Sequence, residues 1–147
     1  MNTRRHVPGT DERLPGNRLA LILFQTAFWI PLLVCTYLAL TPEPPDNPVF
    51  RLSDVLLHGA AFTYLSLALV LAQFGITTTR QSIYVRSFVL MLGYGIFLEL
   101  MQSLVPERSA ELKDLLVDVV GIVIGLSLAA VLAGPVYDLT LRLSARL

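Results

Sequence analysis

The chain has 147 residues, of which 54% are hydrophobic and only 15% are charged, and its formal net charge is zero. A soluble domain usually carries about a quarter of charged residues, whereas a mean hydropathy of +0.66 is typical of an integral membrane protein. The balanced charge gives no indication of a nucleic-acid partner. The single cysteine, Cys35, excludes an intramolecular disulfide and argues against a cysteine-based metal site.

The first hydrophobic segment, residues 19–40, contains no charged residue and is long enough to cross a bilayer, which takes about 20 apolar residues. A secretory signal peptide is the alternative interpretation. Its apolar region would run for only about 7–15 residues, and no clear small-residue cleavage site follows this segment. We therefore predict a retained transmembrane helix, preceded by a polar, disordered, cytoplasmic segment over residues 1–17.

Three further hydrophobic segments have the same character, at residues 54–76, 83–104 and 112–133. Ser53 is a suitable N-cap for the first of them, and Gly134 and Pro135 are expected to end the last. The sequence thus predicts an all-α polytopic membrane protein, a bundle of four transmembrane helices over residues 18–135. Residues 136–147 are predicted to form an amphipathic cytoplasmic tail along the membrane surface.

Basic residues divide unevenly between the two sides of this predicted bundle. Of the 11 lysines and arginines, eight fall in the N-terminal segment, the middle loop and the C-terminal tail, and three fall in the other two loops. Cytoplasmic loops of membrane proteins carry the excess of basic residues. We therefore expect a multi-pass protein of the inner (plasma) membrane with both termini in the cytoplasm.

Each of the last three predicted helices carries a pair of polar residues at its outer end. The spacing of three or four residues places each pair on one helical face: Asp54 and His58, Glu99 and Gln102, Asp114 and Asp118. With a rise of 1.5 Å per residue, His58, Glu99 and Asp118 would lie roughly 6–9 Å below the helix ends. Gly121 and Gly125 continue the face of Asp118 and predict a close contact with another helix.

The segments DVLLH (residues 54–58), ELMQSLVPER (99–108) and DLLVDVVGIVIG (114–125) together resemble the VanZ-like family of small integral membrane proteins. The family pattern is approximately D-K-x-x-H, E-x-x-Q-x-x-x-P-x-R and D-x-x-x-N-x-x-G-x-x-x-G. Val55 stands where the family often has lysine, and Asp118 where asparagine is common. Both differences make the site more acidic, which favours a shared proton or a bound cation. The family is named for a protein linked to teicoplanin resistance, so the resemblance implies a role in the cell envelope.

Ionisable residues inside a membrane usually face the bundle interior or a water-filled cavity and mark functional sites. We expect Glu99 to face His58 and Asp118 in a cavity open to the outside, and these three are the candidate catalytic residues. The candidate binding residues are Asp54, Gln102, Arg108 and Asp114. Structural explanations stay open for several of them, since Glu99 could pair with Arg108, Gln102 could join two helices, and acids in a first turn stabilise the helix dipole.

Three functions fit this pattern. The first is an enzyme that acts on a lipid-linked cell-envelope substrate at the outer leaflet, with Glu99 or His58 as general acid or base and Arg108 holding a phosphate or carboxylate. The second is a non-enzymatic binding or accessory subunit, and the third is a proton or ion transporter. No cofactor and no metal ligand is assigned, although a metal-assisted reaction would suit Mg²⁺ or Mn²⁺. The partners expected are the lipid bilayer and a lipid-linked substrate, with a homodimer or a partner membrane protein left open.

Overall fold

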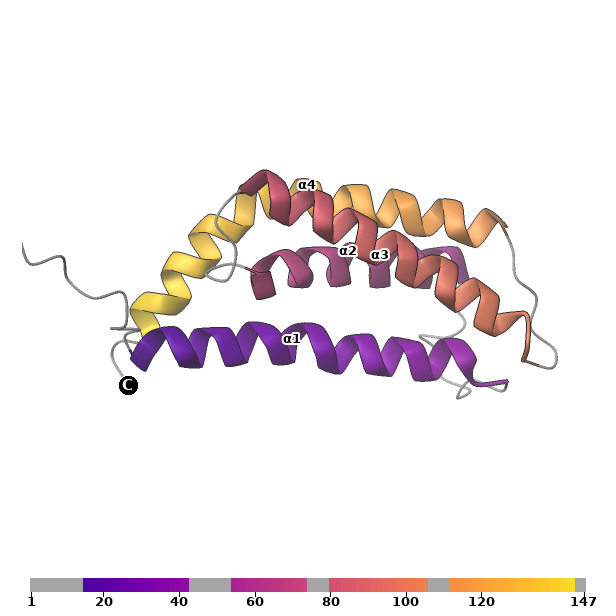
Figure 1. The fold of residues 1–147 in the computed structure, drawn as a ribbon, viewed down its shortest axis with the longest axis horizontal. Coiled ribbons are helices and arrows are strands. Elements are labelled where there is room, and N and C mark those ends of the chain that lie inside the picture. Colours follow the sequence, from indigo (N-terminus) through magenta and orange to yellow (C-terminus); the bar gives the residue numbers. More distant parts are fainter. Residues whose placement is uncertain (1–14, 43–53, 74–79, 106–111, 145–147) are drawn as a thin grey trace, which may run out of the picture.

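The computed structural model describes residues 15–42, 54–73, 80–105 and 112–144. These residues form four helices: α1 (Pro15–Leu40), α2 (Asp54–Gln73), α3 (Arg80–Gln102) and α4 (Leu112–Ser144) (Figure 1). All four are long and apolar enough to cross a membrane, and no strand occurs in the described part of the chain. The predicted all-α bundle of four transmembrane helices is confirmed.

The helix boundaries differ from those expected in α1, α3 and α4. Helix α3 runs from Arg80 to Gln102 and not over residues 83–104. Helix α1 begins at Pro15, so it includes the last three residues of the segment predicted to be disordered; proline suits the first helical position because its missing N–H has no helical partner there. Helix α4 continues through Gly134 and Pro135 to Ser144, so the predicted end at Ala133 is wrong. Proline crowds the carbonyl four residues before it and so bends a helix. The last turns of α4, drawn in yellow, indeed change direction in Figure 1.

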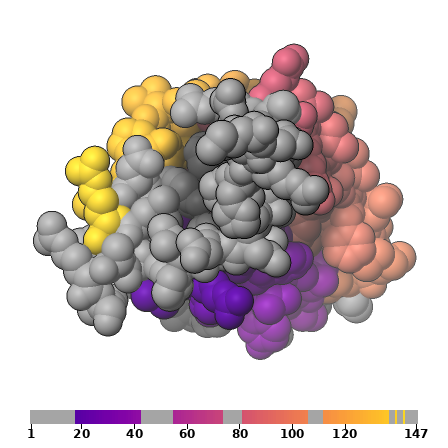
Figure 2. All heavy atoms as spheres, turned by 60° about the vertical axis from the view of Figure 1, so that its left-hand side comes forward, coloured from indigo at the N-terminus to yellow at the C-terminus, as the bar shows by residue number. Residues whose placement is uncertain are grey.

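The helices form one bundle with an apolar outer surface. In the space-filling view, α1 lies along the bottom, α3 on the right and α4 at the upper left (Figure 2). Large apolar side chains such as Leu33, Tyr37 and Val131 are exposed on this surface. Because lipid chains are as apolar as these side chains, burying them brings no hydrophobic gain in a bilayer. Close packing and hydrogen bonds between helices must therefore hold the bundle together.

The closest packing is between α2 and α4. A Cβ added at Gly121 would lie 2.7 Å from the carbonyl oxygen of Gly59, and one at Gly125 would collide with the carbonyl oxygen of Thr63. Thr63 Oγ1 also donates a hydrogen bond of 3.2 Å to the carbonyl of Gly121. The two backbones are thus in direct contact, and the close helix contact predicted from the two glycines is confirmed, with α2 as the partner helix.

A second contact compensates for a proline in α1. Pro31 has no N–H, so the carbonyl of Ala27, four residues earlier, lacks its helical donor. The hydroxyl of Tyr64 on α2 donates to this carbonyl at 2.8 Å. Proline is tolerated in membrane helices where a neighbouring group satisfies the backbone in this way. The same bond fixes α1 against α2.

We expect Gly125→Ala to destabilise the bundle, because the added methyl group would overlap the Thr63 carbonyl and lie 2.9 Å from Ser66 Cβ. Overpacking of this kind costs about 1–3 kcal/mol. Denaturant unfolding in detergent, followed by circular dichroism, measures the change. Gly93→Ala is the matched control, since a Cβ there meets nothing within 4 Å. Equal stability of the two variants would contradict the α2–α4 contact.

Candidate functional site

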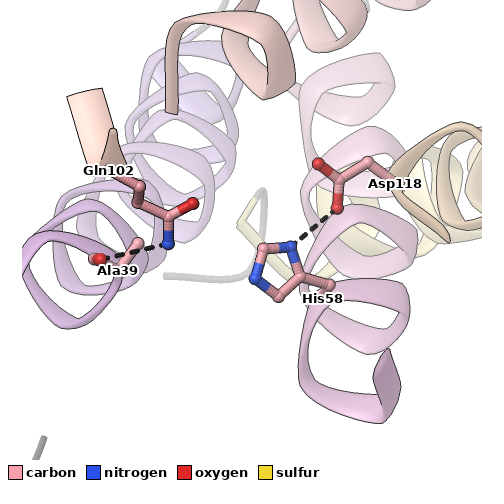
Figure 3. Close-up of polar contacts among 4 residues, drawn as sticks. All are labelled: Ala39, His58, Gln102 and Asp118. Atoms are coloured by element: carbon pink, nitrogen blue, oxygen red, sulfur yellow. Dashed lines mark hydrogen bonds and ion pairs between the residues drawn. The ribbon is translucent and has the colours of Figure 1, made fainter. Parts of the chain in front are cut away.

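A histidine and an aspartate from the two closely packed helices meet near one end of the bundle. Nδ1 of His58 on α2 lies 3.0 Å from Oδ1 of Asp118 on α4 (Figure 3). The side chain of His58 is 17% exposed, whereas that of Asp118 is only 1% exposed. The backbone contact at Gly59 and Gly121 lies directly beside this pair, so the glycines that bring the helices together also bring these side chains into hydrogen-bonding range.

Helix α3 adds a second carboxylate to the pair. Glu99 is 8% exposed, and one potential ligand atom each from His58, Glu99 and Asp118 lies within 4.8 Å of the other two. The three residues predicted as a functional group are therefore brought together, each from a different helix. We call these three residues the polar cluster.

Gly95 is a part of the site that the sequence reasoning missed. A Cβ at this position of α3 would lie 3.1 Å from Asp118 Oδ2 and 3.4 Å from the ring of Phe62. The absence of a side chain therefore leaves room for the Asp118 carboxylate. A sequence signal was present, because Gly95 lies four residues before Glu99 and hence on the same face of α3.

The remaining predicted site residues have different positions. Gln102 is buried and its Nε2 donates to the carbonyl of Ala39 at 3.1 Å, which joins α3 to the last turn of α1 (Figure 3). Asp114 is half-buried in the first turn of α4, where a carboxylate is favoured by the helix dipole. Asp54 begins α2, but its side chain lies outside what the structure describes, as does Arg108.

The hydrogen bond between His58 and Asp118 holds one proton, which either residue can supply. When Asp118 is ionised its carboxylate can only accept, so Nδ1 of His58 is then the donor. The second ring nitrogen points away from Asp118 in Figure 3. A histidine held in this way has Nε2 as a proton acceptor, which is the arrangement required of a general base.

Fold and site together define a four-helix integral membrane protein with a cluster of histidine and two carboxylates near one end of the bundle. The chain belongs to the VanZ/LLP1 family, whose model matches residues 11–133. The resemblance seen in the three sequence segments is thereby confirmed. No curated protein and no solved structure matches the chain.

Gln102 is expected to stabilise the helix bundle, because its hydrogen bond joins two helices. Gln102→Leu should lower the free energy of unfolding by about 0.6–1.7 kcal/mol, the range for such bonds in membranes. Gln81→Leu is the control, since Gln81 is exposed near the other end of the same helix. Unfolding of both variants in detergent decides the question. A loss for Gln81→Leu as large as that for Gln102→Leu would show that the bond to Ala39 contributes nothing specific.

Proposed function

We propose that the polar cluster forms an outward-facing site that binds the polar head group of a lipid-linked cell-envelope compound. The observation that carries the proposal is the His58–Asp118 pair, with Glu99 beside it, inside helices that can cross a membrane. Charged groups are costly at membrane depth and are retained mainly where they meet a ligand, an ion or each other. The family's link to a glycopeptide that binds lipid-linked cell-wall precursors agrees with this choice of substrate class.

The depth of the cluster supports a head-group site. His58 lies four residues after the start of α2, Asp118 six residues after the start of α4, and Glu99 three residues before the end of α3. At 1.5 Å per residue these are depths of about 4–9 Å from the helix ends. Such depths correspond to the head-group side of the hydrocarbon core, not to the midplane. A proton relay would need ionisable groups across the whole thickness. Among the described residues, the buried polar side chains toward the other end of the bundle, such as Gln73 and Ser87, carry no charge, which argues against transport.

The chemistry that the cluster can supply is proton transfer. His58 Nε2 would take a proton from a hydroxyl or water at the head group, while Asp118 stabilises the imidazolium that forms. Glu99 would then hold a second proton or orient the reacting group. These are the parts of a general acid–base site, and they place hydrolysis or transfer at a head group among the reactions to test.

An accessory role without turnover is the second candidate. The observation that favours it is the burial of Asp118, which at 1% exposure cannot itself touch a substrate. In that case the protein would hold the lipid-linked compound, or a partner membrane protein, without changing it.

The topology is tested with a single reactive cysteine. In a Cys35→Ser background we expect Asn47→Cys to react with an impermeant thiol reagent on intact cells, because the distribution of basic residues predicts that the first loop lies outside. Thr78→Cys, in the middle loop, should react only after the membrane is opened. Labelling with the opposite pattern would place the polar cluster on the cytoplasmic side and overturn the outward-facing site.

Ligand binding is tested by native mass spectrometry of the protein extracted gently from membranes. The wild type should carry a lipid with a polar head group, and Glu99→Gln should lose most of it, because the carboxylate that completes the cluster is gone. Asp138→Asn removes the same charge near the far end of α4 and should retain the lipid. Equal lipid occupancy in all three proteins would contradict a head-group site at the cluster.

A further inference from the structure

We propose that the polar cluster holds a six-coordinate divalent cation of the Mn²⁺ type, with His58 Nδ1, the Asp118 carboxylate and one carboxylate oxygen of Glu99 as ligands. The proposal rests on the proposed function in one respect, since the cation would receive the anionic group of the lipid-linked substrate. Binding of the cation itself is a separate property and can be measured alone.

The short contact between His58 and Asp118 matches the spacing of two metal ligands. Two atoms that lie about 2.1 Å from one ion at right angles are about 3 Å apart. The distance between His58 Nδ1 and Asp118 Oδ1 is 3.0 Å. A cation would therefore take the place of the proton between them with little movement of either side chain. The ring proton of His58 would then lie on Nε2, so in the cation-bound state His58 is a ligand and not the general base.

The third ligand lies within reach of the same point. Ligand atoms on opposite sides of such an ion are about 4.2 Å apart. One Glu99 oxygen lies within 4.8 Å of a ring nitrogen of His58 and of an Asp118 oxygen, so binding of one ion requires a rotation of the Glu99 side chain toward the other two ligands. The three ligands come from α2, α3 and α4, so the ion would also join these helices.

A separate observation at Asp118 also points to a ligand. Its Oδ2 is buried and has no hydrogen-bond partner among the described residues, and a buried acceptor without a donor costs about 1–3 kcal/mol. This oxygen faces Gly95, one turn from Glu99, where a Cβ would stand at 3.1 Å. A cation bound by both oxygens of the Asp118 carboxylate would offset the cost.

The ligand set selects the class of cation and leaves coordination positions at which the cation can bind substrate. Carboxylates favour Mg²⁺ and Mn²⁺, and an imidazole shifts the preference toward transition metals. Three protein ligands leave positions for water and for substrate oxygens. Two carboxylates alone would repel a phosphate, whereas a cation between them would bind it, as metal ions do in phosphoryl-transfer enzymes. The cation thereby makes an acidic cluster compatible with an anionic head group.

The test is an Mn²⁺ titration of the full chain in detergent, followed by electron paramagnetic resonance. A His6→Ala background leaves His58 as the sole histidine. We expect one Mn²⁺ site per chain, with pulsed spectra showing coupling to an imidazole nitrogen. His58→Gln should abolish this coupling. Asp118→Asn and Glu99→Gln should each weaken binding more than about tenfold, because loss of even an outer-shell partner of a metal ligand costs about 10–100-fold in affinity. Asp138→Asn should bind as tightly as the parent protein.

Two results would overturn the cation site. The first is that the parent protein binds no Mn²⁺. The second is equal binding by all variants without nitrogen coupling, which would mean that Mn²⁺ binds only to surface carboxylates. Circular dichroism and size-exclusion chromatography verify the fold of each variant. If Asp118→Asn fails to fold, the nitrogen coupling and its loss in His58→Gln decide. If the protein still carries lipid in the mass spectra after EDTA treatment and binds no Mn²⁺, the cation site is refuted and the head-group site is retained. If Mn²⁺ binds at the cluster but no lipid is retained, the cation site is retained and the head-group site is refuted.

Discussion

The direct backbone contact between α2 and α4 is the constraint on which the rest of the structure depends. In a bilayer, helices associate through close packing and hydrogen bonds, because burial of apolar surface brings little gain. Gly121 and Gly125 allow α4 to lie against the carbonyls of Gly59 and Thr63. That approach sets the distance between His58 and Asp118, one turn away, and thus the geometry of the polar cluster. A larger residue at either glycine would separate the pair as well as the helices.

The other helices are positioned by hydrogen bonds at several depths. Tyr64 bonds the Ala27 carbonyl that Pro31 leaves without a donor, and Gln102 bonds the Ala39 carbonyl at the end of α1. Toward the opposite end of α2 from His58, Gln73 donates to Ser87 at 2.7 Å and so joins α2 to α3. These contacts hold α3 where Glu99 completes the cluster. Gln102 lies only three residues from Glu99 but joins two helices, which explains why it resembled a site residue in the sequence.

The sequence predicted the helices and the residues that each helix presents on one face. Apolar length predicted the four helices, and the position of each polar pair relative to its helix end placed His58, Glu99 and Asp118 in one layer. The particular contacts between helices were not predictable: the space that Gly95 leaves has meaning only once Asp118 points toward it. The end of α4 was wrong because Gly134 and Pro135 were expected to end the helix, whereas the chain bends there and continues to Ser144.

The central claim is that His58 and Asp118 are hydrogen-bonded between α2 and α4. Nitrogen-15 magnetic resonance of the imidazole, in a His6→Ala chain without added metal, tests it most directly because His58 is then the sole histidine. We predict a protonated Nδ1 bonded to a carboxylate, with ring signals that shift in Asp118→Asn and stay unchanged in Asp138→Asn. Ring signals that are identical in the parent chain and in Asp118→Asn would contradict the pair and the site built on it.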